Sequence, residues 1–125
     1  MITREKIIKN YIDAYNNFNI EKMLVDLDEN IKFKNISNGI TNMALNDLFS
    51  FKAQAKQSKN LFTKRTQTIK SWKHDDTITE IEVDYKAVLA IDLPNGLKKG
   101  ENLDMQGKSI FKFLGNKIIE LTDIS

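Results

Sequence analysis

One acidic residue lies where an acid is not expected. Asp123 alternates with Ile119 and Leu121 along a predicted strand, so its carboxyl shares their apolar face. An acid on such a face is costly unless it is paired or protonated. We interpret Asp123 as a candidate pocket acid or base with a raised pKa. The alternative is a carboxylate that points to water, because only two residues follow it in the sequence.

Two tyrosines could supply hydroxyl donors. Tyr11 and Tyr15 follow Ile8 and Ile12 at the spacing of one helical face, so both point toward the predicted core. Most tyrosines at this spacing belong to the core, with the hydroxyl bonded to a neighbour. The catalytic residues are not determined by these patterns, and Tyr11 and Asp123 are the candidates.

Asn35 is a third polar candidate. It shares a strand face with Ile31 and Phe33, which predicts a pocket group that orients a ligand. The alternative is an asparagine at the strand end, bonded to the adjacent turn. The inward faces of the other predicted strands add further wall residues. The complete predicted pocket comprises Tyr11, Tyr15, Phe33, Asn35, Trp72, Tyr85, Met105, Ser109, Phe111, Leu121 and Asp123.

Metal and cofactor sites are not expected. The chain has no cysteine and one histidine, His74, in a Lys-His-Asp-Asp segment that predicts a surface turn. The common zinc arrangements need more ligands than this. Asp75 and Asp76 do not make a calcium loop, and no glycine-rich phosphate loop is present.

The charge balance argues against a nucleic-acid partner. Nineteen basic and 17 acidic residues give a net charge of +2. The basic cluster Lys52, Lys56, Lys59, Lys64 and Arg65 is interpreted as a solvated surface without interleaved aromatic residues. We expect no membrane association, because no segment approaches the ~18 consecutive apolar residues of a spanning helix. Without a recognisable secretory signal, a cytoplasmic location is expected.

The elements that would position these residues follow a simple order. Helices are predicted over the first segment, from Ile20, and from about Asn42 with Ala44 in its apolar stripe. A strand lies between the second and third helices, at Ile31 to Ile36, and four strands follow from Phe62. The predicted order is α-α-β-α-β-β-β-β in a single domain over residues 1–125. Short turns favour an antiparallel sheet, which the helices cover.

Several segments together resemble a known superfamily. They are the opening helix and break at residues 11–19, the segment at residues 90–96, the strand at residues 107–113 and the segment at residues 115–123. In order and spacing these resemble SnoaL-like members of the nuclear transport factor 2-like superfamily. The resemblance implies an α+β fold in which a curved antiparallel sheet forms a cone-shaped half-barrel around a pocket. It also implies a homodimer, but it does not identify a function.

The steroid isomerase branch of this superfamily offers a residue-by-residue comparison. The resemblance places Tyr11 on the donor tyrosine, Asn35 on the carboxylate base and Ser109 on the donor aspartic acid. An amide cannot abstract a proton from carbon, so we do not expect steroid isomerisation. The same topology predicts that the Tyr11 hydroxyl and the Asp123 carboxyl open onto one cavity.

Three functions remain as hypotheses. The first is a protein that binds a small, largely apolar ligand in the cone. The second is an enzyme of cyclase, dehydratase or isomerase type that uses Asp123 and Tyr11. The third is a protein-interaction module, which predicts a filled cone and an exposed apolar patch. We also expect a homodimer through the outer strand faces, where Val88, Ala90 and Ile110 interrupt the polar pattern.

Overall fold

Three helices and one six-stranded sheet make up residues 2–125, which the computed structural model describes. The strand order across the sheet is β2-β1-β6-β5-β4-β3. The elements are α1 (Ile2–Asn16), α2 (Ile20–Leu24), β1 (Leu27–Ser37), β2 (Ile40–Leu45), α3 (Leu48–Lys59), β3 (Phe62–His74), β4 (Ile78–Leu89), β5 (Asn102–Leu114) and β6 (Lys117–Ile124).

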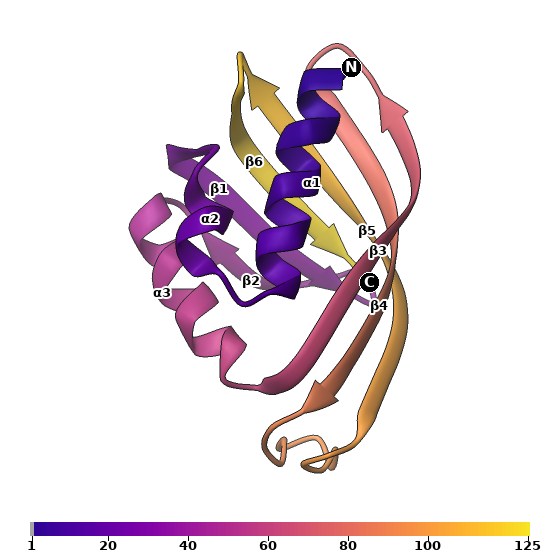
Figure 1. Ribbon diagram of the computed structural model, residues 1–125. Coiled ribbons are helices and arrows are strands. Elements are labelled where there is room, and N and C mark those ends of the chain that lie inside the picture. Colours follow the sequence, from indigo (N-terminus) through magenta and orange to yellow (C-terminus); the bar gives the residue numbers. More distant parts are fainter. Residues whose placement is uncertain (1) are drawn as a thin grey trace.

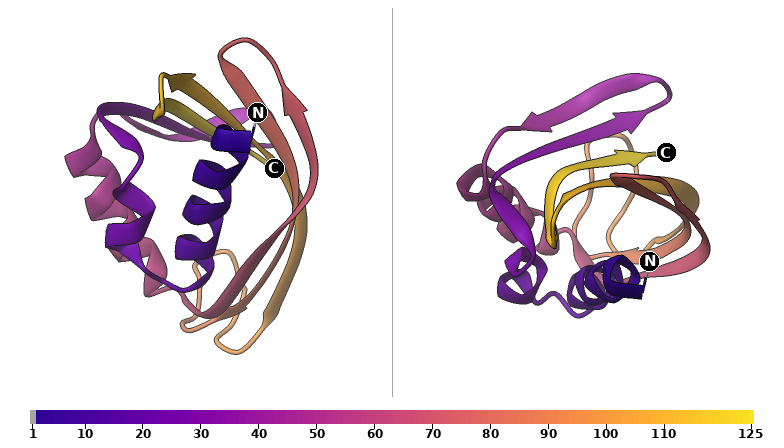
Figure 2. Two further views of the ribbon diagram at one scale, coloured as in Figure 1. Left: turned by 45° about the horizontal axis from the view of Figure 1, so that its top comes forward. Right: turned by 90° about the horizontal axis from the view of Figure 1, so that it is seen from above.

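The sheet curves around the helices. α1 lies across its concave side, and α2 and α3 stand beside α1 toward β1 and β2 (Figure 1). The view from above in Figure 2 shows the long strands bending around the end of α1. The predicted α+β class with a curved, cone-like sheet is therefore confirmed. The sheet does not close, because β2 and β3 are its two free edges.

One strand pair departs from the predicted antiparallel arrangement. β1 and β6 run parallel, with Asn35 beside Asp123, so the sheet is mixed. The antiparallel prediction followed from short turns, and it holds for β3 through β6. β1 and β6 are far apart in the sequence, and no tight turn between them dictates their direction.

The predicted start of the third helix was wrong. A second strand, β2, occupies Ile40–Leu45 and pairs with β1 through a hairpin. Asn38 and Gly39 both have positive φ, at 53° and 78°, which suits a two-residue hairpin turn. The helix begins only after Asp47, whose carboxylate accepts a hydrogen bond from the Ser50 backbone N–H at 2.7 Å. Ala44 therefore belongs to a strand.

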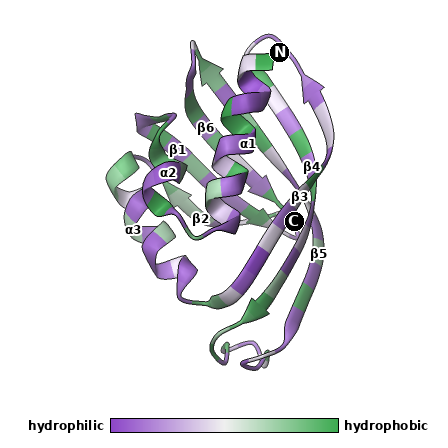
Figure 3. Ribbon diagram, in the orientation of Figure 1, coloured by the Kyte–Doolittle hydropathy of each residue, from purple (hydrophilic) through white to green (hydrophobic). Residues whose placement is uncertain are grey.

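The core lies between α1 and the concave face. Hydrophobic and hydrophilic residues alternate along the strands (Figure 3), and in β4 Ile81, Val83 and Ala87 are buried. From α1, Ile8 is fully buried against this layer. The result is a sheet whose inner face is packed at one end and leaves room for a cavity elsewhere.

The single histidine ties the first helix to the sheet. His74 ends β3 instead of lying in the predicted turn, and it is partly buried. Its Nε2 lies 2.8 Å from Glu5 Oε2, and its Nδ1 lies 2.9 Å from the Thr79 hydroxyl. This contact fixes the N-terminal half of α1 over the sheet. Within residues 2–125, the helices are too short and too polar to cross a membrane.

Candidate functional site

A cavity of about 310 Å³ lies between the helices and the concave face. Every helix and four of the strands contribute to its wall, which contains Tyr11, Tyr15, Met23, Phe33, Asn35, Met43, Leu45, Phe51, Gln54, Ala55, Ser58, Phe62, Arg65 and Asp123. Nine of these side chains are aliphatic or aromatic, and the other five are Asn35, Gln54, Ser58, Arg65 and Asp123. That composition is typical of a small-molecule site.

A second cavity of about 300 Å³ adjoins the first. The two share Tyr15, Asn35 and Asp123, which therefore stand between them. Tyr85, Met105 and Ser109 line only the second one, and Met105 is 44% exposed at its wall. Asp123 therefore lines both cavities.

Strand pairing sets the polar residues in one row across the sheet. Asp123 on β6 lies between Asn35 on β1 and Ser109 on β5. The row continues to Ile81 on β4 and Trp72 on β3. Residues paired across strands point to the same face, so the strand order brings these polar groups together on the concave side.

The Asp123 carboxyl is partly shielded from solvent. Burial raises its pKa to about 6, and a hydrogen bond from Ser109 works against this rise. The Ser109 hydroxyl donates to Asp123 Oδ1 at 2.6 Å, and Ser109 itself is buried. A carboxyl with a pKa of about 6 exchanges its proton near neutral pH, as acid–base chemistry requires.

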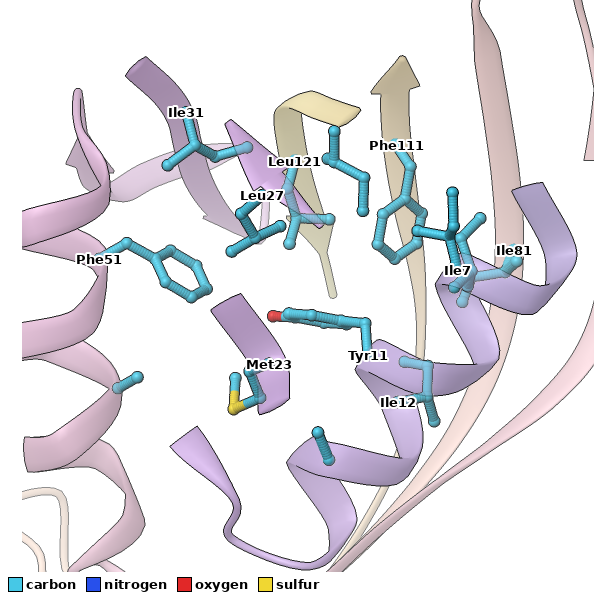
Figure 4. Close-up of a cluster of buried hydrophobic side chains, with 14 of the residues drawn as sticks. Ile7, Tyr11, Ile12, Met23, Leu27, Ile31, Phe51, Ile81, Phe111 and Leu121 are labelled. Carbon is cyan, nitrogen blue, oxygen red and sulfur yellow. The ribbon is translucent and has the colours of Figure 1, made fainter. Parts of the chain in front are cut away.

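Tyr11 brings a protonated hydroxyl to the same cavity. Its ring reaches from α1 toward Met23 and Phe51, with the hydroxyl at the leading end (Figure 4). Burial, and then the Asp123 carboxylate, holds the pKa of Tyr11 well above its usual value. Tyr11 therefore remains a hydrogen-bond donor at any ordinary pH.

Tyr15 and Tyr85 are bonded to each other. Their hydroxyl oxygens lie 2.9 Å apart, and burial raises the pKa of both phenols. This pair joins α1 to β4 and forms a wall between the helix and the second cavity. Asn35 has a partner as well, since its Nδ2 donates to Asn42 Oδ1 at 2.9 Å.

Three predicted pocket residues are in the core and line neither cavity. Phe111 and Leu121 are fully buried, and the Phe111 ring meets the Tyr11 ring edge-on with centroids 5.9 Å apart. Trp72 packs against the core and stacks on His74. The alternating pattern predicts the correct face of the sheet for these residues. Whether a residue on that face lines the cavity or belongs to the core depends on the tertiary packing.

Arg65 is the main residue that the sequence interpretation missed. The sequence predicts a solvated basic surface that includes Arg65, but Arg65 is only 2% exposed and lines the first cavity. Its position two residues before Gln67 and four before Ile69 was the available signal, because all three alternate onto the concave face. Phe51 and Phe62 are further wall residues absent from the predicted set.

The hydrogen bond from Ser109 gives a direct test of the Asp123 environment. Ser109→Ala removes a donor to the ionised carboxylate, so the pKa of Asp123 should rise above 6 by about one pH unit. Carboxylate-detected NMR titration measures this. Ser71→Ala, at an exposed position on β3, should leave it unchanged. An unchanged or lower pKa in Ser109→Ala would show that this hydrogen bond does not favour the ionised carboxylate.

Proteins of the same architecture are nuclear transport factor 2-like and SnoaL-like proteins. A candidate polyketide cyclase from Xanthomonas campestris pv. campestris is 16% identical with a TM-score of 0.83, and the match covers 98% of this chain and 90% of that one. A candidate SnoaL-like polyketide cyclase from Jannaschia is 8% identical with a TM-score of 0.83, covering 98% of this chain and 84% of that one.

A nuclear transport factor 2-like protein of unknown function from Burkholderia pseudomallei is 8% identical with a TM-score of 0.79, and the match covers 98% of this chain and 90% of that one. No family model matches the sequence, and no curated protein matches it significantly. At these identities the likeness establishes the fold. The chain has the fold of SnoaL-like members of the nuclear transport factor 2-like superfamily, as its sequence predicts.

Proposed function

We propose that the protein binds a small, largely apolar molecule carrying a hydrogen-bond acceptor in the cavity beside Tyr11 and Asp123. The observation that carries this proposal is the cavity of about 310 Å³, whose largely apolar wall includes these two polar groups. Its volume is at the lower end of the ~300–1,000 Å³ of ligand sites. An open cavity favours this function over an interaction module, for which a filled cone was expected.

A neutral fluorescent probe tests the proposal. Prodan, a naphthalene that carries a ketone acceptor, changes its fluorescence in apolar surroundings, and we expect saturable binding to the wild-type protein. Ser58→Trp places an indole at the wall of the cavity, so it should reduce probe affinity by about tenfold or more, a difference of ~1.4 kcal/mol. Gln57→Trp adds the same ring at an exposed neighbour on α3 and should leave affinity unchanged.

Absence of saturable binding to the wild-type protein would overturn the proposal. Equal loss in Ser58→Trp and Gln57→Trp would move the binding site out of this cavity. Circular dichroism of both variants checks that each is folded.

The second candidate function is an acid–base enzyme of cyclase, dehydratase or isomerase type. The pKa of about 6 at Asp123 favours it, because such a group is largely ionised at neutral pH and still accepts a proton. In this mechanism the Asp123 carboxylate would take a proton from a carbon next to a carbonyl. The Tyr11 hydroxyl would donate to the oxygen on which negative charge develops. The names of the Xanthomonas and Jannaschia neighbours agree with this class of chemistry.

The expected assembly is a homodimer through the outer faces of the strands. Ile110 is half-buried and pairs with Glu80 and Thr122. Two ion pairs flank it and neutralise local charge, Lys108–Glu80 at 3.6 Å and Lys112–Glu120 at 3.3 Å. An apolar side chain within a charge-neutral surface suits the centre of a two-fold interface.

Light scattering tests this assembly. We expect a dimer mass at micromolar concentration and a monomer mass for Ile110→Lys, because two lysines would meet near the two-fold axis. Phe49→Lys, on the exposed part of α3, should remain dimeric. A monomeric wild-type protein would contradict the proposed dimer.

A further inference from the structure

Arg65 is a buried cation without a matching anion. It forms no ion pair with any carboxylate of residues 2–125. Its Nη2 atom is sealed from water and has no hydrogen-bond partner within the same range. Burying a charge with an unused donor is unfavourable, so this arrangement calls for an explanation.

The contacts that Arg65 does make hold it in place without neutralising it. Its Nε donates to the Tyr15 backbone carbonyl at 2.8 Å, near the C-terminus of α1. The guanidinium lies 3.7 Å from the centre of the Tyr15 ring and 4.5 Å from that of Phe18. Aromatic faces and a helix C-terminus both favour a cation. These contacts hold the guanidinium beside the end of α1, and Arg65 is one of the residues that line the first cavity.

A purely structural role for Arg65 would use only one of the N–H donors of its guanidinium group. Capping α1 needs the Nε donor, which is already bonded, and leaves Nη2 without a function. A guanidinium offers parallel donors suited to two oxygens of one carboxylate. Such oxygens would reach Arg65 from the cavity that it lines. Because Nη2 is buried in this structure, binding would require a change of the Arg65 side-chain torsions that turns Nη2 toward the cavity.

We propose that Arg65 is the ligand-recognition residue of the cavity and that its ligand is a small organic anion with an apolar body and a carboxylate. This inference rests on the proposed binding function and adds the charge of the ligand to it. The apolar body would lie against Phe33 and Phe51, which meet edge-on with centroids 5.4 Å apart. The anionic oxygens would lie at the Arg65 end.

The protonation state of Asp123 affects the choice of conditions. The other titratable side chains that line the two cavities with it are Tyr11, Tyr15, Arg65, Tyr85 and Lys108, and the three tyrosines stay neutral. An ionised Asp123 would repel an anionic ligand, whereas the protonated form would donate to it. Measurements at about pH 5 therefore combine a mostly protonated Asp123 with an ionised aromatic carboxylate.

Two matched probes test the inference, 2-naphthoate and its neutral methyl ester, with dissociation constants measured by calorimetry. We expect the wild-type protein to bind naphthoate about tenfold or more tightly than the ester. Arg65→Met removes the charge at similar length and should weaken naphthoate by about tenfold while the ester changes by less than about twofold. Lys64→Met removes the same charge from the exposed face of β3 and should change neither.

The outcomes separate this inference from the proposed function. Equal affinity of the wild-type protein for the two probes would overturn the anion inference and leave a neutral-ligand site. Equal weakening of both probes in a folded Arg65→Met would show a structural role and overturn it as well. If neither probe binds the wild-type protein, both proposals fail. Should Arg65→Met not fold, the wild-type preference and Arg65→Lys, which should retain part of that preference, decide the matter.

Discussion

Asp123→Asn is expected to stabilise the protein by up to about 3 kcal/mol at pH 8 and to have little effect below about pH 3. The carboxyl has a pKa of about 6 in the folded protein against an ordinary value of 3.8. Each pKa unit corresponds to ~1.36 kcal/mol, so the full effect is about 3 kcal/mol. Asparagine keeps an oxygen that accepts from Ser109 and removes the charge.

The direction follows from the raised pKa. Below about pH 3 the carboxyl is protonated in both the folded and the unfolded state, so burial costs little. As pH rises, the unfolded state ionises first, and wild-type stability falls until the pH passes the folded-state pKa of about 6. The variant escapes this loss.

Urea denaturation across this pH range measures the effect. Asp104→Asn, at an exposed position on β5, removes an equal charge and should show no comparable trend. A constant difference between Asp123→Asn and the wild-type protein at all pH values would contradict the raised pKa. If the protein is an acid–base enzyme, the same stabilised variant should lose its activity, because it has no group that exchanges a proton.

Phe111→Ala is expected to destabilise the protein by about 3–5 kcal/mol. Phe111 is fully buried and its ring packs edge-on against Tyr11, so truncation leaves a hole beneath the cavity wall. Thermal and urea unfolding measure the loss, and Phe49→Ala provides the matched control. Phe49 is 83% exposed, so its truncation should change stability by no more than about 0.5 kcal/mol.

This prediction also separates a core residue from a pocket residue. Truncating a phenylalanine that lines a cavity would reduce the stability of the protein only slightly, because one side of its ring already faces open space. A loss below about 1 kcal/mol in Phe111→Ala would place Phe111 at the cavity after all.

Local periodicity in the sequence is enough to predict the layers of the fold. A period of about 3.6 residues marked α1, and a period of two marked β4 and β5 so clearly that Ile81, Val83 and Ala87 lie inward as expected. Each of these periods lies within a single helix or strand, because each element turns its own apolar side toward the core. The same alternation identified Asp123 as an acid on an inner face, before its neighbours were known.

The residues that surround Asp123 are set by strand pairing between distant parts of the chain. The parallel pairing of β1 with β6 sets Asn35 beside it, and the β5–β6 register sets Ser109 on its other side. Neither register is encoded by a local pattern, since strand partners distant in sequence are chosen by the packing of the whole sheet. The sequence did not predict β2 for the same reason. The apolar spacing from about Asn42 predicts a helix, but pairing with β1 makes the start of this segment a strand.

Arg65 shows the same limit most clearly. Its sequence neighbours include lysine and threonine, and a charged residue is almost always exposed unless it is paired. Alternation along β3 turned it inward, and the end of α1 supplied the Tyr15 carbonyl and ring that hold it there. The local sequence shows that Arg65 is charged. Its burial depends on contact between β3 and α1, where Arg65 meets Tyr15, a residue 50 positions earlier in the chain.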